Sequence, residues 1–364
     1  MEKSFEGVFA PRNCTPRIVT IEAPCKINLH LGIGQKRPDG FHELESIFAS
    51  LALGDTLRFE RCGEKGAWHL FMNWEVPETP IPPEKNLVLR AVSLFREKTG
   101  FNPGLSIDLV KRIPAGAGLG GGSSDAASAL LAMNLLSSSA LTMDELGEMA
   151  ALLGSDVPFF LSGGAAFVSG RGEKTEPVKA PGGLWVVLVK PPFSSDTAGA
   201  YRLLDEARER AAASPMREPV KQGLPKEELP KEGLPKEELP KEALISALAQ
   251  DPHCWPFKND FLAVFLDPDR VSEREQGEIA FAQRAAYRAI LGKLRSEGAS
   301  FAGLSGSGSC CFGVFSARQT AEKAVKAFTR KEFGPVFRAA DPSNQGIFVR
   351  LTFFVAQNSN AVLE

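Results

Sequence analysis

The chain has 364 residues, of which 43% are hydrophobic and 24% charged, with 42 Lys and Arg against 44 Asp and Glu. These values suit a globular protein of about two domains and exclude a wholly disordered, collagen-like or coiled-coil chain. A net charge of −2 offers no excess of basic residues, so no nucleic-acid partner is expected.

Neither a membrane span nor a secretory leader is expected. The longest nearly apolar run, Ala126 to Leu136, is far shorter than the roughly 20 residues of a membrane helix. The N-terminus has no basic start followed by an apolar core, so we expect a cytoplasmic protein without a membrane partner. The six cysteines form no C-x-x-C pair; Cys310 and Cys311 are expected as reduced thiols on opposite faces of a strand.

Strand patterns dominate the first 60 residues. Alternation over Ile18 to Leu31 predicts a half-buried strand that carries Lys26, Asn28 and His30 on one face. The turn residues 37–40 then predict two further strands, at 41–51 and 56–60, which a turn at Gly54-Asp55 separates.

Helix signals follow. Asn86 can cap a helix over 87–99 that Gly100 ends, and a capping box from Thr142 to Glu145 opens a helix that stops at Gly154. The remaining expected elements are a strand at 105–110, helices at 125–136, 277–296 and 317–331, and strands at 301–304, 310–315 and 346–355.

A repeat interrupts this pattern. Residues 223–242 contain four copies of a five-residue unit, GLPKE or ELPKE, in which proline at every fifth position opposes helix and sheet. We expect an extended, flexible surface insert at about 207–256. A tolerated expansion is favoured over a docking segment, because long surface insertions cost little.

A glycine-rich loop carries the strongest functional signal. Between Pro114 and Ser124, five of the seven residues 116–122 are glycine, and a predicted helix follows. Glycines let the backbone approach a ligand, and the first turn of a helix offers free N–H groups, so the loop predicts phosphate binding rather than a structural turn.

The loop differs from two common nucleotide motifs. No lysine follows its last glycine, which excludes a Walker A loop. The glycines at 116, 118 and 121 match the dinucleotide fingerprint, but no acidic residue ends a strand about 20 residues later. A Rossmann oxidoreductase is therefore the less favoured alternative.

The residues from Pro114 to Ser124 resemble the signature loop of the GHMP kinases, small-molecule kinases that bind ATP through a glycine loop between a strand and a helix. Further segments are similar to the branch of this family whose substrate carries a cytidine diphosphate group: APCKINL at 23–29, RPDGFHEL at 37–44, LGSDVPFF at 153–160 and GSGSC at 306–310. The resemblance covers about 19–203 and 257–316.

This resemblance implies an α+β, two-domain GHMP kinase fold with the active site in the interdomain cleft. The expected parts are an N-terminal extension at 1–17, an ATP-binding domain at 18–180, and a C-terminal domain at 181–364 that the insert interrupts. ATP and Mg²⁺ are the implied cofactors. The oligomeric state is not predicted.

The resemblance also assigns ATP-binding residues. The loop would hold the phosphates, Asn86 and Lys111 would lie near the nucleoside, and Ser124 would lie near Mg²⁺. By themselves, Asn86 is equally explained as a helix cap and Lys111 as a charge at a strand end. The loop residues in question are Pro114, Gly116, Gly118, Leu119, Gly120, Gly121, Gly122, Ser123 and Ser124.

Two residues are candidates for the chemistry. Asp156 follows the helix stop at Gly154, and its residue type and position support a general base and a helix N-cap equally. The resemblance favours the base and places Lys26 beside it, although lysines on strands are usually solvated charges. Asn28, on the same face as Lys26, could hydrogen-bond the substrate.

For the substrate, the resemblance implies that Phe41 stacks on cytosine while the His42 segment hydrogen-bonds the edge of the base. Phe193 would be a second stacking partner, with Thr197 nearby, and a second glycine turn would close over the site through Gly306, Ser307 and Gly308. Two alternatives remain open: a GHMP kinase for another alcohol, such as mevalonate or homoserine, and a non-catalytic nucleotide-binding protein.

Overall fold

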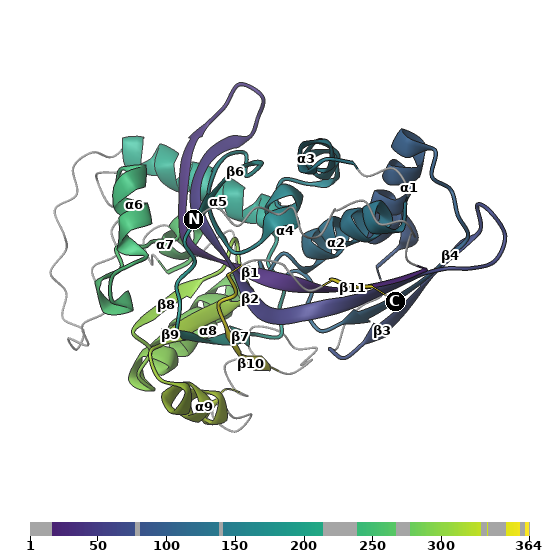
Figure 1. Ribbon diagram of the computed structural model, residues 1–364. Coiled ribbons are helices and arrows are strands. Elements are labelled where there is room, and N and C mark those ends of the chain that lie inside the picture. Colours follow the sequence, from purple (N-terminus) through teal and green to yellow (C-terminus); the bar gives the residue numbers. More distant parts are fainter. Residues whose placement is uncertain are drawn as a thin grey trace, which may run out of the picture.

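The computed structural model describes residues 17–76, 81–137, 141–213, 239–266, 277–328, 333, 347–356 and 361–363. The predicted N-terminal extension, except for its last residue, and most of the pentapeptide repeat lie outside these ranges. The described chain forms two sheets with helices packed on them (Figure 1), which confirms the α+β class.

The larger sheet has seven strands in the order β11-β1-β2-β4-β3, with β5 paired to β2 and β6 to β5. The strands are β1 (Ile18–Lys36), β2 (His42–Arg61), β3 (Trp68–Trp74), β4 (Leu105–Lys111), β5 (Ala165–Gly170), β6 (Lys174–Val178) and β11 (Ala361–Leu363). β1 and β2 form a long antiparallel hairpin that rises above the other elements in Figure 1.

The strand predictions for this sheet were incomplete, and β5, β6 and β11 were not predicted. The expected strands at 41–51 and 56–60 are one strand, because a register shift opposite Pro24 and Cys25 absorbs the extra residues near Gly54 as a bulge. β3 was missed. Its residues alternate between half-buried and exposed, and it pairs in parallel with β4 at the edge of the sheet.

Four helices cover one face of this sheet (Figure 1): α1 (Leu87–Thr99), α2 (Gly121–Leu136), α3 (Met143–Leu153) and α4 (Val157–Ser162). The predicted caps are confirmed. The Asn86 side chain accepts from the amides of Val88 and Leu89, and Thr142 and Glu145 form the capping box. α2 begins four residues earlier than expected, so the end of the glycine loop is its first turn.

The second sheet has the order β10-β7-β9-β8, all antiparallel, with strands β7 (Trp185–Lys190), β8 (Phe301–Leu304), β9 (Cys311–Phe315) and β10 (Phe348–Phe353). Helices α8 (Gly277–Ser296) and α9 (Arg318–Ala327) pack on it. Cys310 and Cys311 are free and belong to different apolar clusters, as expected for opposite faces.

Helix α5 (Thr197–Ala213) precedes the repeat, α6 (Lys241–Ala247) begins within its last copy, and α7 (Asp260–Leu266) follows it. Short 3₁₀ turns occur at Pro83–Lys85 and Pro252–Cys254. The insert predicted at 207–256 was therefore too wide, because α5 continues to Ala213 and α6 begins at Lys241. Apolar stripes that include Leu204 and Leu244 bury these helices against the body.

One apolar cluster joins the two sheets. It contains Ile27 and Leu29 of β1, Leu119 of the glycine loop, Leu188 of β7 and Phe312 of β9, all of them buried. None of the helices in the described ranges is long and apolar enough to span a membrane.

Candidate active site

The glycine loop lies where the two sheets meet. Gly116, Gly118 and Gly120 have φ angles of +61°, +75° and +71°, which side chains disfavour. A Cβ on Gly118 would stand 2.1 Å from the carbonyl oxygen of Ser305, and one on Gly120 would stand 2.8 Å from the Phe160 ring. The loop needs these glycines because other backbone and an aromatic ring press against it.

The first turn of α2 offers unpaired amides. The amide of Ser124 donates to the carbonyl of Gly120, the first bond of the helical ladder. The amides of Gly121, Gly122 and Ser123 precede that bond and have no partner within the helix. Together with the positive end of the helix dipole, they can hold a phosphate group.

A buried ion cluster lies next to the start of the glycine loop. The Lys111 ammonium pairs with Asp55 and lies 2.6 Å from Asp125 Oδ2, and all three side chains are at least 95% buried. Asp55 also accepts from the amide of Ile113, just before the loop. Lys111 was expected near the nucleoside; the structure instead engages its amine in this cluster. Asn86, the other expected nucleoside contact, is buried as the cap of α1.

Burial raises the pKa of Asp125 to about 7. The nearby Lys111 ammonium opposes this shift, whereas the neighbouring Asp55 carboxylate adds to it. One lysine cannot neutralise two buried carboxylates, so Asp125 holds its proton more tightly than an exposed carboxyl would. The same carboxylates raise the pKa of Lys111 against the effect of its own burial.

The loop is bound to the two other predicted motifs. Its Leu119 carbonyl accepts from the Lys26 amide at 2.9 Å, and its Gly118 carbonyl accepts from the Ser305 hydroxyl at 2.8 Å. The Ser305 hydroxyl in turn accepts from the Asn28 amide at 3.3 Å. Segments nearly 280 residues apart in the sequence thus meet, as the resemblance implied.

Lys26 and Asp156 form an ion pair beside the loop. Lys26 Nζ lies 3.4 Å from Asp156 Oδ2, and it donates to Asn28 Oδ1 at 2.6 Å. The lysine side chain is 5% exposed and that of Asp156 33% exposed. Asp156 is the N-cap residue of α4, as the alternative predicted, but its side chain makes no cap hydrogen bond, so the carboxylate is not used in capping.

His30 does not share the face of Lys26 and Asn28. A register shift between Asn28 and His30 interrupts the alternation. The His30 ring packs edge-on against Phe257, and its Nδ1 accepts from the Lys258 amide. Burial and the nearby Lys258 charge lower the pKa of His30 to about 4, so this histidine is neutral at physiological pH.

Phe41 and His42 stand at the end of the β1–β2 hairpin where the chain turns from β1 into β2. Phe41 is 54% exposed, and the Arg171 guanidinium lies 5.0 Å from its ring centre. His42 is buried and stacks on Tyr201 of α5 with a centroid distance of 4.9 Å. Burial, with the negative charge of Asp156, raises the pKa of Tyr201 to about 12.

Tyr201 is the aromatic residue that the sequence analysis missed. Phe193 was expected to be the second stacking partner, but it is buried in the second sheet's core, edge-on to Tyr287. Tyr201 instead reaches both His42 and the neighbourhood of Asp156. The only sequence signal was its place beside the apolar stripe of α5, which looks like core.

The second glycine turn is tied to the start of α5. The Thr197 and Ser307 hydroxyls lie 2.8 Å apart, and a Cβ on Gly306 would stand 3.6 Å from Asn28 Oδ1. Gly308 has a φ of +90° and follows Ser307 in the same turn. Thr197, Gly306, Ser307 and Gly308 therefore lie near the loop and the Lys26 strand.

The described residues fit Mg²⁺ only weakly. They contain no group of three or more His, Cys, Asp or Glu side chains that could hold a metal ion. The Ser124 hydroxyl has no hydrogen-bond partner but is fully buried, which argues against its predicted place beside Mg²⁺. Such an ion would depend mainly on oxygens of bound phosphates, as Mg²⁺ often does.

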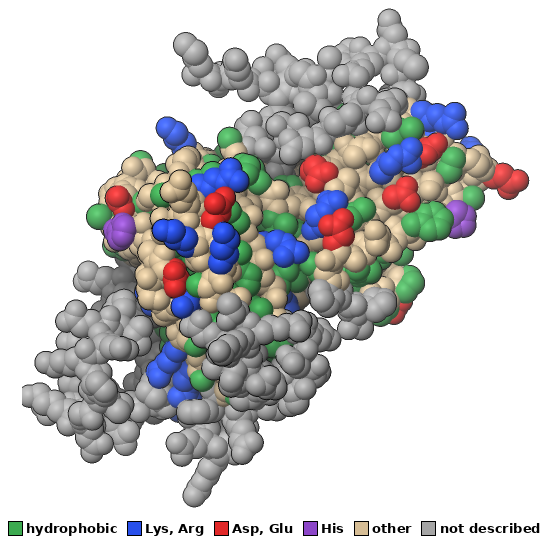
Figure 2. All heavy atoms as spheres, turned by 90° about the horizontal axis from the view of Figure 1, so that it is seen from below, with side chains coloured by type: hydrophobic (Ala, Val, Ile, Leu, Met, Phe, Trp, Pro, Cys, Tyr) green, Lys and Arg blue, Asp and Glu red, His purple; other side chains and the backbone are tan. Residues whose placement is uncertain are grey.

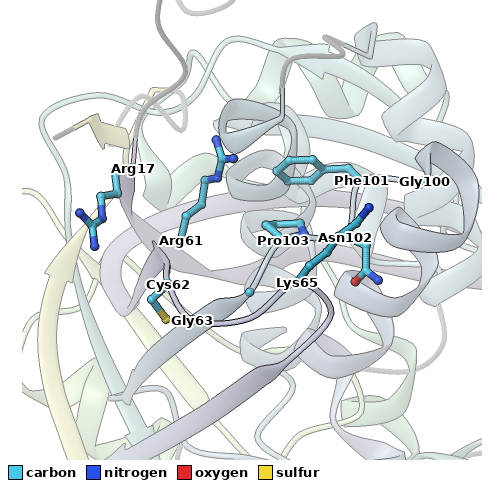
Figure 3. Close-up of a pocket in the computed structure, with 10 residues that line it drawn as sticks. Arg17, Arg61, Cys62, Gly63, Lys65, Gly100, Phe101, Asn102 and Pro103 are labelled. Carbon is cyan, nitrogen blue, oxygen red and sulfur yellow. The ribbon is translucent and has the colours of Figure 1, made fainter.

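A large surface hollow lies elsewhere. It measures about 660 Å³, and its walls include Arg17, Arg61, Lys65 and Phe101 (Figure 3). None of the predicted site residues lines it. On the face shown in Figure 2, basic and acidic side chains are interspersed, with no large patch of one sign.

Comparison with known proteins gives the family. The GHMP kinases N terminal domain matches residues 86–164, and the GHMP kinases C terminal domain matches residues 272–334. A chloroplastic 4-diphosphocytidyl-2-C-methyl-D-erythritol kinase from Oryza sativa subsp. japonica is 47% identical over 184 residues, 50% of this chain and 45% of the rice protein. The matched region thus spans about half the length of the plant relatives.

A bacterial relative matches over more of its length. The enzyme of the same name from Pelotomaculum thermopropionicum is 43% identical over 209 residues, 57% of this chain and 71% of that protein. Among solved structures, 4-(cytidine 5'-diphospho)-2C-methyl-D-erythritol kinase is 30% identical with a TM-score of 0.62, covering 92% of this chain and 98% of its own. A homoserine kinase from Cytophaga hutchinsonii, 16% identical with a TM-score of 0.57 and covering 97% of this chain and 99% of its own, shares the fold alone. By these matches, the chain belongs to the 4-diphosphocytidyl-2-C-methyl-D-erythritol kinase family of the GHMP kinases.

Proposed function

We propose that this chain transfers the γ-phosphoryl group of ATP to the 2-hydroxyl of 4-diphosphocytidyl-2-C-methyl-D-erythritol, a step in the non-mevalonate route to isoprenoid precursors. The observation that carries the proposal is the double role of Lys26. Its amide holds the glycine loop through Leu119, and its ammonium lies 3.4 Å from Asp156. Lys26 therefore supplies the cation and contacts both the phosphate-binding loop and the candidate base.

The chemistry follows from these positions. The free amides at the start of α2 bind phosphate oxygens of ATP, and Asp156 accepts the proton of the attacking hydroxyl. The Lys26 ammonium lies beside that carboxylate and polarises the hydroxyl, while Asn28 holds the ammonium in place. Mg²⁺, when bound with ATP, would neutralise charge on the phosphates.

Substrate recognition is assigned to the hairpin end and α5. Phe41 presents an exposed ring for stacking on cytosine, and His42 with Tyr201 forms the adjoining wall. A kinase for mevalonate or homoserine would need no such aromatic site. The rice relative is named as chloroplastic, whereas a cytoplasmic location for this chain stays a prediction.

The test is release of ADP by purified protein with Mg-ATP and the cytidine-bearing alcohol, run beside mevalonate and homoserine. We expect turnover of the first alone, and a fall of roughly 10²- to 10⁴-fold in kcat for Asp156→Asn. Turnover of mevalonate or homoserine at the same rate as the cytidine-bearing alcohol would overturn the proposed substrate assignment. ATP binding without ADP from any alcohol would favour the non-catalytic alternative.

A further inference from the structure

His42 has a carboxylate partner that the proposed reaction does not use. Its Nε2 lies 2.7 Å from Asp205 Oδ1, although the two residues are 163 positions apart. The His42 side chain is 5% exposed and that of Asp205 24%. Tyr201, one helical turn before Asp205 on α5, stacks on the same imidazole. Helix α5 thus orients the plane of the His42 ring through Tyr201 and provides a hydrogen-bond partner for Nε2 through Asp205.

This contact decides which ring nitrogen carries the proton. An ionised carboxylate can only accept a hydrogen bond, so Nε2 must be the donor. In a neutral imidazole the other nitrogen, Nδ1, is then left as an acceptor. Within the described part of the chain, Nδ1 makes no hydrogen bond of its own, so its lone pair remains for a ligand.

An acceptor at this position distinguishes two pyrimidines. Cytosine carries an exocyclic amine, which donates, where uracil carries a carbonyl oxygen, which only accepts. We propose that Asp205 is a positioning residue that holds His42 in the Nε2–H tautomer, so that Nδ1 accepts from the cytosine amine and the site rejects uracil. This inference rests on the proposed function, since it assumes that the base lies beside His42.

A purely structural role for Asp205 is less consistent with the surroundings. Other contacts already tie α5 to the hairpin: the Arg208 guanidinium donates to the carbonyls of Ile33 and Gly34, and Leu204 packs in an apolar cluster with Ile33. Lys36 reaches the second carboxylate oxygen of Asp205 from the surface, at 3.4 Å and with 59% of its side chain exposed. The helix therefore keeps several anchors when Asp205 is replaced.

The test measures CDP and UDP binding by titration calorimetry, and the tautomers of the four histidines by ¹⁵N NMR. We expect wild type to prefer CDP and to hold His42 as the Nε2–H form. Asp205→Ala should lose most of the CDP preference and raise KM for the cytidine substrate about five- to tenfold, with kcat within about twofold. Asp205→Asn should restore much of the preference, because its amide oxygen can still accept from Nε2.

Glu206→Gln is the matched control, since Glu206 is the next residue on α5 and pairs only loosely with Arg210 at 3.8 Å. It should leave the preference unchanged. If wild type prefers CDP but Asp205→Ala keeps the full preference, or if wild-type His42 carries its proton on Nδ1, the inference is wrong and the proposed function stands. Equal binding of CDP and UDP by wild type would overturn both. The NMR measurement on wild type needs no variant to fold.

Discussion

A side chain added at Gly118 of the glycine loop would clash with neighbouring backbone. Gly118→Ala would place a Cβ 2.1 Å from the Ser305 carbonyl at a φ of +75°, so the loop must shift away from the second glycine turn. We expect a loss of about 1 to 3 kcal/mol in the free energy of unfolding and a raised KM for ATP. Urea unfolding and steady-state kinetics measure both.

Gly147 supplies the control for that substitution. It lies inside α3, where an added Cβ meets nothing within 4 Å and the backbone is helical. Gly147→Ala should therefore stabilise the protein by about 0.5 to 1 kcal/mol and leave KM for ATP unchanged. If Gly118→Ala were as harmless as Gly147→Ala, the loop would not be held against Ser305 as described.

Among single residues of the site, the sequence predicted some and missed others. Lys26, Asp156 and the glycines stand in contiguous motifs, so their residue types and neighbours pointed to the site. Tyr201 and Asp205 stand on a helix whose pattern reads as an ordinary amphipathic surface, and their partner His42 is distant in sequence. Phe193 was misplaced because an aromatic ring beside a motif can as easily fill the core, which it does.

At the scale of elements, the junction of β4 and α2 has a titrating ion cluster. The pKa of Asp125 is about 7 in the folded protein against 3.8 as the ordinary value, so between these values the folded state holds a proton that the unfolded state releases. Stability from this group is therefore fully present below about pH 3.8 and is lost as the pH rises through about 7. Asp125→Asn should remove this part of the pH dependence.

The measurement is the urea midpoint of wild type and variant from pH 4.5 to 8. We expect the wild-type midpoint to decline relative to that of Asp125→Asn across this window. Asp108→Asn is a control on β4, the strand that carries Lys111, where the Asp108 side chain is 49% exposed and 3.6 Å from Arg58; its profile should run parallel to wild type. Parallel profiles for wild type and Asp125→Asn would show that burial does not hold the proton on Asp125.

Elements were easier to predict where local chemistry determines their ends. Asn86, Gly100 and the Thr142 capping box fixed α1 and α3 to the residue. β2 was split because Gly54-Asp55 looks like a turn, whereas both residues pair with β1 and the strand continues past a bulge at Ala52 and Leu53. β3 has a clear alternation but was not predicted; it pairs with β4, and Trp68, Leu70 and Met72 pack against the apolar core.

At the scale of the whole molecule, the expected domains at 18–180 and 181–364 share one apolar cluster, in addition to the core that each has of its own. Ile27 of β1 and Phe312 of β9 belong to the same buried cluster, and the Ala117 carbonyl accepts from the Cys310 amide at 3.1 Å. Cutting the chain at 180 would expose that cluster on both parts. We therefore propose that these domains are structural divisions of one cooperative unit.

The four tryptophans allow a direct test, since two lie in each part: Trp68 and Trp74 before residue 180, Trp185 and Trp255 after it. One double variant replaces the first pair with Phe and another replaces the second, so that fluorescence follows one part at a time. We expect each variant's fluorescence transition in urea to coincide with its own circular dichroism transition, as a two-state protein requires. Because saturating ATP binds only the folded form, it should raise both transitions together. If the fluorescence of either variant changes at a urea concentration clearly different from its loss of secondary structure, the part it reports on unfolds independently, and the shared cluster does not couple the two sheets.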